Sequence, residues 1–216
     1  MIQQVVDIFL LRKNFFIELI WEHLALTGIS ILIAAIIGLI LGIVISEFKQ
    51  FSFLVLGFTN VVYTIPTIAL FGMLILFSGI GNTTAIIALT LYALLPMVRN
   101  TYTGIVSIDP GIIEAAIGMG STKLQLLFRI KLPLAMLVIL TGIRNMVVMT
   151  IATAGIAAFI GAGGLGVAIY RGISTNNTAM TFAGSILIAL MALLADYLLG
   201  LLEKMIQKKW RLASSK

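Results

Sequence analysis

The chain has 216 residues, of which 61% are hydrophobic and only 10% are charged, and its mean hydropathy is +1.16. Soluble domains carry about 25% charged residues, so this composition excludes a water-soluble globular protein and predicts one that crosses a membrane several times. The net charge is +6, but the basic residues stand between and after the apolar segments, which argues against nucleic-acid binding. With no Cys and a single His, the chain has no means to form disulfides or thiolate metal sites.

The N-terminal segment, residues 1–22, mixes charged with apolar residues and predicts an amphipathic segment that is retained, not a cleaved signal peptide. His23 follows at the start of the first long apolar run, where we expect it at the membrane interface. Five apolar segments then predict five transmembrane helices, since about 20 helical residues cross the hydrocarbon core of a bilayer. Their approximate bounds are residues 24–45, 53–77, 84–106, 134–160 and 179–202.

Pro66 lies inside the second apolar segment. A proline in the interior of a helix either kinks it or divides it into two shorter helices. We expect one kinked helix here. Both a packing role and a role in gating remain open for this residue.

The distribution of basic residues predicts the orientation, because cytoplasmic loops of membrane proteins are rich in Lys and Arg. The 109–131 loop carries three such residues, and the C-terminal tail carries Lys204, Lys208, Lys209, Arg211 and Lys216. Both segments are therefore expected in the cytoplasm, and five crossings then place the N-terminus outside. The basic tail could also attract anionic membrane lipid, although a topology signal is the simpler interpretation.

The loop at residues 109–133 is unusual because it reads as helical. Asp109-Pro110 is typical of a helix start, Ser121 is the expected cap of a second short helix, and Pro133 opens the next span. Four apolar residues of the second helix share one face, as expected for a segment that docks into a groove of a partner. They are Leu124, Leu127, Phe128 and Ile130.

A spaced motif occupies the same loop. It reads Glu114-Ala115-Ala116, three residues, Gly120, nine residues, Ile130, one residue, Leu132-Pro133. This pattern resembles the EAA loop of ABC importer permeases, with every element at the family spacing. The resemblance implies coupling helices that contact a separate ATPase subunit, which binds ATP and Mg²⁺. The chain itself has no phosphate-binding GxxxxGK[ST] loop, so we expect a transport subunit that binds no cofactor and is not an enzyme.

Three further stretches are similar to the permeases of osmoprotectant importers, which carry glycine betaine, carnitine or choline. They are residues 63–67, 95–104 and 160–166. The resemblance implies an all-α membrane protein of the bacterial plasma membrane with a MetI-like core of five transmembrane helices in one domain. It also implies an extracytoplasmic binding protein and a second permease chain, for which a paralogue is favoured over an identical copy. A methionine-type or other small-solute permease is the alternative.

Several residues are candidates for the solute pathway or its gate. Tyr63, Pro66 and Arg99 fall within the similar stretches, and Arg144 and Asp196 are ionisable residues inside predicted spans, where charges are costly unless they are paired or face a cavity. We expect Arg144 and Asp196 to interact toward the cytoplasmic side. The alternative, that each lies at a lipid boundary, stays open.

A glycine run completes the set of candidates, at Gly161, Gly163, Gly164 and Gly166. It matches the GxGxxG pattern of dinucleotide sites, but it lacks the preceding strand that such a site requires. We therefore interpret it as a tight re-entrant turn near a partner. Two other classes of function remain, a membrane-embedded enzyme and an energy-independent channel. Stable co-purification with an ATPase would distinguish the importer from both.

Overall fold

The computed structural model describes residues 2–214, with side chains described for residues 3–208. The tail residues Lys209, Trp210, Arg211 and Lys216 lie outside the described side chains. Within the described range the chain is helical and contains no strand, as expected for an all-α membrane protein. The α-helices are α1 (Ile2–Leu11), α2 (Lys13–Glu47), α3 (Ser52–Thr64), α4 (Thr67–Ser78), α5 (Asn82–Val106), α6 (Pro110–Gly118), α7 (Lys123–Leu126), α8 (Leu132–Ala154), α9 (Gly166–Ser174) and α10 (Thr178–Ser214).

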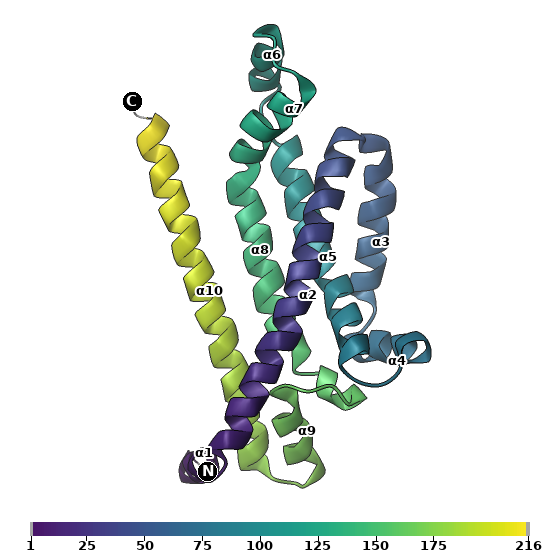
Figure 1. The fold of residues 1–216 in the computed structure, drawn as a ribbon, viewed down its shortest axis with the longest axis vertical. Helices are drawn as coiled ribbons and strands as arrows, with labels where there is room; N and C mark the ends of the chain where they lie inside the picture. Colours follow the sequence, from purple (N-terminus) through teal and green to yellow (C-terminus); the bar gives the residue numbers. More distant parts are fainter. Residues whose placement is uncertain (1, 215–216) are drawn as a thin grey trace.

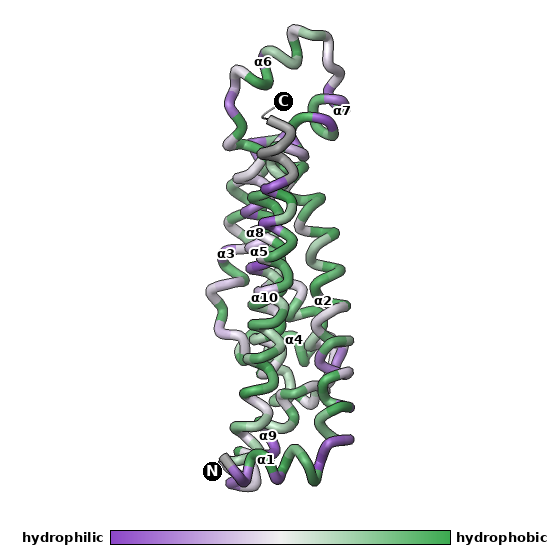
Figure 2. Tube along the Cα trace, turned by 90° about the vertical axis from the view of Figure 1, so that its left-hand side faces the viewer, coloured by the Kyte–Doolittle hydropathy of each residue, from purple (hydrophilic) through white to green (hydrophobic). Residues whose placement is uncertain are grey.

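Among the described residues, four helical stretches are long and apolar enough to cross a membrane: α2, α5, α10 and the stretch Lys123–Ala154 that ends with α8. The consecutive helices α3 and α4 pass the same test only as a pair, which would make a fifth span. The long helices run side by side along one axis (Figure 1), and the hydrophobic residues fill the middle of the bundle (Figure 2). Hydrophilic residues gather mainly at its two ends.

The break at Pro66 is much sharper than a kink. Helices α3 and α4 are bent by 104° relative to each other, so the expectation of one kinked helix is wrong. Ile65 adopts an extended conformation with ψ 127°, as residues before proline prefer, and its carbonyl accepts a hydrogen bond from Tyr92 Oη of α5. Pro66 is the N-cap residue of α4, whose Phe71 is fully buried against α5. Helix α4 therefore lies across the bundle at the base of α3 (Figure 1).

Helix α5 is the centre of the bundle and packs against α2, α3, α4 and α8. The contact between α2 and α5 is close because one face of α2 carries only small residues at intervals of four. At Gly42, a Cβ atom would lie 2.5 Å from Cβ of Thr101, and at Gly38 it would lie 2.7 Å from Cβ of Met97. Small residues allow transmembrane helix backbones to approach in this way. The buried stripe comprises Ser30, Ala34, Gly38, Gly42 and Ser46.

The N-terminal segment departs from the expectation in two respects. Residues 13–22, expected to belong to a separate amphipathic segment, are the first turns of α2, and only α1 is separate. His23 is fully buried and hydrogen-bonds through Nε2 to the carbonyl oxygen of Ile151, 3.0 Å away. The expected interfacial position of His23 is therefore wrong. Helix α1 packs on α10 through Val5, which is buried.

The two ends of the molecule differ in what they carry. Helices α6 and α7 project at one end, the loop end, where α10 also finishes (Figure 1). The N-terminus and α9 lie at the opposite end. Residues 161–178, between the predicted fourth and fifth spans, contain α9, a helix of 9 residues.

Candidate functional site

Helix α6 presents the first part of the loop motif at the loop end. Asp109 caps the helix by accepting a hydrogen bond from the Gly111 N–H at 2.7 Å, and Pro110 occupies the first turn. Glu114 and Ala115 are exposed, whereas Ala116 is buried. The motif therefore places one carboxylate and one small side chain on an accessible helix face.

Gly120 ends α6 with a backbone that only glycine adopts at little cost. Its φ is +85°, its N–H bonds to the carbonyl of Ile117 at 2.9 Å, and the Ser121 N–H bonds to the carbonyl of Ala116 at 3.1 Å. These two bonds form a Schellman motif, which reverses the chain toward α7. The cap of α7 is Thr122 rather than the expected Ser121, and it forms a capping box with Gln125.

The second part of the motif leads directly into a membrane helix. Residues 127–131 form a π-helical turn between α7 and α8, and Pro133 lies in the first turn of α8. Three residues at this junction are half-buried, so they pack against the bundle instead of pointing fully into solvent. They are Ile130, Leu132 and Pro133. Lys131 Nζ pairs with Glu47 Oε1 of α2 at 2.5 Å, which connects the same junction to the first long helix.

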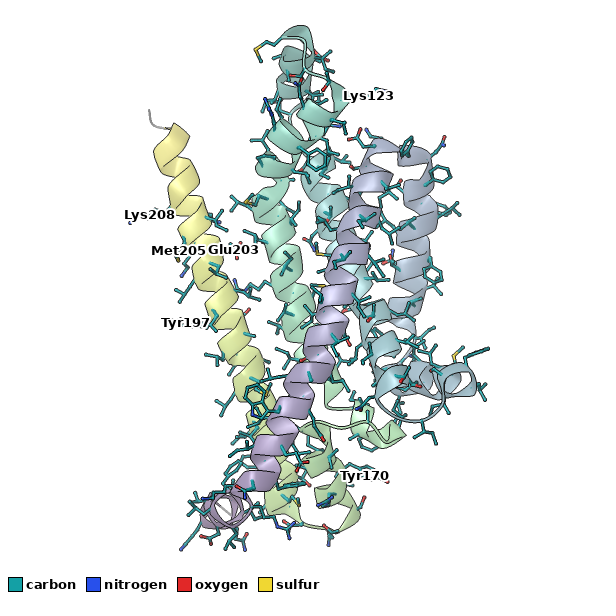
Figure 3. The ribbon with its side chains drawn as sticks, viewed as in Figure 1. Lys123, Tyr170, Tyr197, Glu203, Met205 and Lys208 are labelled. Atoms are coloured by element: carbon teal, nitrogen blue, oxygen red, sulfur yellow. The ribbon has the colours of Figure 1, made fainter. Side chains whose placement is uncertain are left out.

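The surface of this loop end carries large apolar side chains among exposed charged ones such as Glu114 and Arg129. Leu124 and Phe128 are 69% and 61% exposed, whereas Leu127 and Ile130, expected on the same apolar face, are half-buried. Lys123 lies beside them at the start of α7 (Figure 3). Exposed apolar groups of this density on a projecting element mark a surface that a partner covers. The other large apolar side chains exposed here are Ile112, Ile117 and Met119.

A second feature is a cavity of about 540 Å³ between α3, α5, α8 and α10 that is open at the surface of the bundle. It brings together three of the residues singled out as pathway candidates, from three different helices: Tyr63 of α3, Arg99 of α5 and Asp196 of α10. The remaining lining residues are Leu95, Pro96, Asn100, Asn145, Val148, Met149 and Ala152. Polar side chains at this depth are costly in lipid and are normally covered by protein or by a water-filled cavity.

Tyr63 and Arg99 each contact neighbouring side chains that hold them in place. The Tyr63 ring packs edge-on against Tyr92 with centroids 6.2 Å apart, and its hydroxyl donates to Sδ of Met149 at 3.5 Å. A guanidinium nitrogen of Arg99 donates to Oδ1 of Asn60 on α3 at 2.9 Å. None of the ion pairs among residues 3–208 involves Arg99.

The expected pair of Arg144 and Asp196 is present and joins α8 to α10. Arg144 donates from Nε and a terminal nitrogen to the two carboxylate oxygens of Asp196, at 2.6 and 2.7 Å. This two-point geometry is the strong form of the interaction. Glu203 adds a contact of 3.4 Å to Arg144 and accepts from Thr141 at 3.1 Å, and it lies on the side of α10 that faces α8 (Figure 3). Arg144 lies near the middle of α8.

The glycine run lies at the opposite end, against the start of α2. Gly161 and Gly164 have φ of +74° and +92°. The Gly163 and Gly164 N–H groups donate to Oδ1 of Asn82 at 2.9 Å and Oε2 of Glu22 at 2.8 Å. A Cβ at Gly166 would collide with the carbonyl oxygen of Gly155. The run is thus a turn, as expected, but what it contacts in this structure is α2 and α5 of its own chain.

Three contributions to these sites were missed from the sequence. Glu203 lies one residue beyond the predicted fifth span, so it was not counted among the intramembrane charges. Asn145 belongs to no motif, and Asn100 lies within the 95–104 stretch but was not singled out because it carries no charge; both line the cavity. The stripe of small residues on α2 could have been found in the sequence, because small residues recur every four positions and include Gly38-x-x-x-Gly42.

Solved structures with a similar fold belong to methionine and amino-acid transporters. An inward-facing structure of the MetNI methionine ABC transporter matches with a TM-score of 0.80, at 22% identity, over 90% of this chain and 97% of that one. An amino acid ABC transporter solved with histidines matches with a TM-score of 0.76 at 20% identity, over 91% and 96%. At these identities the likeness concerns the fold, and it confirms the expected MetI-like architecture.

Relatives of closer sequence have names that refer to osmoprotectants. The carnitine transport permease protein OpuCD of Listeria monocytogenes is 42% identical over 94% of this chain and 92% of its own length. The choline transport system permease protein OpuBD of Bacillus subtilis is 41% identical over 94% and 90%. The osmoprotectant import permease protein OsmW of Salmonella typhimurium is 44% identical over 92% and 94%.

The family profile described as "Binding-protein-dependent transport system inner membrane component" matches residues 9–211, almost the whole chain. A family of inner-membrane transport components that depend on binding proteins accounts for the apolar helices and for the projecting loop. It also confirms the expectation of a transport subunit rather than an enzyme. The chain belongs to the family of binding-protein-dependent transport system inner membrane components.

Proposed function

We propose that this chain is the permease subunit of an ATP-driven importer for quaternary ammonium osmoprotectants such as glycine betaine, carnitine and choline. The observation that carries the proposal is the intact EAA-type loop, Glu114 to Pro133, on a projecting end of the bundle with exposed apolar side chains. The solute class is supported by relatives at 41–44% identity that are named for carnitine, choline and osmoprotectants. The methionine-type alternative is supported only at the level of the fold.

The loop end is the proposed contact with the ATPase subunit, which binds ATP and Mg²⁺ in our account. Its exposed apolar side chains dock into a groove of that subunit, and Glu114 makes a charged contact at the rim. Movement of α6 and α7 would reach the bundle by two routes, because residues 127–131 continue into α8 and Lys131 is paired with Glu47 of α2.

In the proposed orientation, the loop end lies in the cytoplasm, which puts the C-terminus inside and the N-terminus outside. The opposite end, with α9 and the glycine run, then meets the extracytoplasmic binding protein. A Ser174→Cys variant tests this orientation. Because the chain has no Cys of its own, the introduced thiol is the one that this chain offers to a reagent. A membrane-impermeant thiol reagent should label it in intact cells, and labelling only after lysis would reverse the orientation.

A second permease chain is proposed to cover the cavity, since Arg99 and Asn145 are exposed at a depth where lipid would solvate them poorly. We favour a paralogue, in line with the separate permeases named OpuCB and OpuCD among the relatives. Co-expression of two differently tagged copies of this chain tests the point. Capture through one tag should not recover the other copy, whereas equal recovery would indicate a homodimer.

The coupling assignment is tested with Glu114→Arg in the complete transporter. Reversing an exposed charge leaves the core intact, so the chain should still insert and accumulate normally in the membrane. Solute uptake and ATP hydrolysis stimulated by the loaded binding protein should both be lost. Normal stimulation by the variant complex would refute the contact. Glu18→Arg, an exposed glutamate at the opposite end, is the matched control for ATPase retention.

A further inference from the structure

The open cavity between α3, α5, α8 and α10 is lined by side chains of opposite charge. Arg99 lines it from α5, and Asp196 lines it from α10, with the Tyr63 ring on a third helix. We propose that this cavity is a binding site for the zwitterionic form of the solute, with Arg99 as the carboxylate-binding residue that distinguishes betaines from choline. The assignment rests on the proposed function, because it concerns the solute that the permease carries.

The guanidinium of Arg99 has capacity for an anion. A guanidinium offers five N–H donors, and the described hydrogen bonds of Arg99 use one nitrogen, toward the neutral Oδ1 of Asn60. That contact fixes the direction of the side chain and leaves its charge uncompensated by any ion pair among the described side chains. A planar fork held in this way suits two-point binding of a carboxylate.

The other side of the cavity suits a cation that needs no hydrogen bond. Of the charged groups here only Asp196 lines the cavity; Arg144 donates to both of its oxygens and also contacts Glu203, so the three groups together carry a formal charge of −1. An ammonium with N–H groups would compete with Arg144 for those oxygens. A quaternary ammonium has no N–H to donate, so it gains from the negative field without breaking the pair.

The methyl groups of a quaternary ammonium also require an apolar or aromatic surface. Tyr63 provides a ring whose orientation is set by Tyr92 and by the hydroxyl contact to Met149, and its side chain remains partly exposed. Aromatic faces attract quaternary ammonium groups through cation–π interactions. Val148 and Met149 line the adjoining surface. The volume of about 540 Å³ lies within the range of small-molecule sites.

The two sides predict a difference between solutes. Glycine betaine and carnitine have a carboxylate and can use both sides of the cavity, whereas choline has a hydroxyl and uses only the ammonium side. Removing the Arg99 charge should therefore weaken the binding of betaines about tenfold or more, the effect of one charge-assisted contact, and leave choline nearly unchanged.

The test uses the complete transporter and the absence of natural cysteines. In an Asn145→Cys variant the new thiol lines the cavity, and its rate of labelling by a thiol reagent reports occupancy. Glycine betaine and choline should both slow this labelling. Adding Arg99→Gln should raise the glycine betaine concentration that halves the labelling rate about tenfold. The choline concentration that halves the rate should stay unchanged. Arg12→Gln, an exposed arginine between α1 and α2, is the control and should change neither.

Import by the same Arg99→Gln variant should show the same selectivity, with glycine betaine uptake falling more than choline uptake. Equal loss for both solutes, or no loss for either, would overturn the assignment of Arg99. A wild-type complex that imports no quaternary ammonium solute would refute the proposed function instead. The labelling assay separates the two outcomes because it detects occupancy of the cavity without transport.

Discussion

Replacing Gly120 by alanine should disrupt the coupling loop through its backbone alone. Gly120 has a φ of +85°, and no atom lies within 4 Å of the position that a Cβ would occupy. The methyl group therefore causes no clash, and the cost is that of a left-handed conformation, about 1–2 kcal/mol for a residue with a side chain. That free energy lowers the population of the native turn between α6 and α7 about 5- to 30-fold relative to its alternatives.

Gly118 provides the matched control within the same motif. It is the last residue of α6, and a Cβ there also meets nothing within 4 Å, but its φ is not positive. Alanine at this position should be neutral or should stabilise the helix by up to about 1 kcal/mol. Both substitutions add one exposed methyl group, so the difference between them isolates the turn. Gly120→Asn should fall between them, since asparagine tolerates the left-handed region better than alanine does.

The assay is solute uptake, together with the amount of ATPase subunit retained on the purified complex, at equal membrane levels of the chain. Gly120→Ala should lower both severalfold, and Gly118→Ala should leave both at the wild-type level. Equal uptake by the two alanine variants would refute the reasoning, because it would mean that the Schellman turn has no part in coupling.

Two more predictions concern the bundle. Gly42→Ala forces α2 away from α5, because its Cβ would lie 2.5 Å from Cβ of Thr101, and overpacking of this kind costs about 1–3 kcal/mol. The purified complex should therefore denature at a lower temperature, whereas Gly28→Ala, on the open face of the same helix, should not lower it. Arg144→Asp and Asp196→Arg should each impair transport, and the double variant should recover part of it. No recovery would count against a functional pair.

The coupling loop was the part of the molecule most open to prediction from sequence. Its helix start at Asp109, its glycine and its closing proline are local signals that do not depend on the rest of the fold. The assignment of the second cap to Ser121 failed by one residue. Thr122 has a glutamine three residues later and can form the reciprocal capping box, a local signal that Ser121 lacks.

The angle at Pro66 was not predictable in the same way. Proline indicates that a helix is interrupted, but a bend of 104° depends on what receives the two halves. Here the hydroxyl of Tyr92 holds the free carbonyl of Ile65, and Phe71 is buried against α5. These contacts join residues far apart in the chain, which a pattern of hydropathy does not encode.

The interaction of Arg144 with Asp196 was predictable from the sequence, because an unpaired charge in a membrane span is costly. Its third member was not, since Glu203 lies where α10 continues beyond the predicted end of the span. Helix α9 was missed because the glycine run before it reads as a turn and hides the start of a helix. Its burial against α10 comes from tertiary packing.

The most direct test of the central claim is uptake of radiolabelled glycine betaine in a host stripped of its own osmoprotectant importers. Cells that express the complete transporter are compared with cells that lack only this chain, with unlabelled carnitine, choline and methionine as competitors. We predict uptake that requires this chain and is reduced by carnitine and choline but not by methionine. Absence of betaine uptake, with methionine imported instead, would contradict the proposed solute class and favour the methionine-type permease.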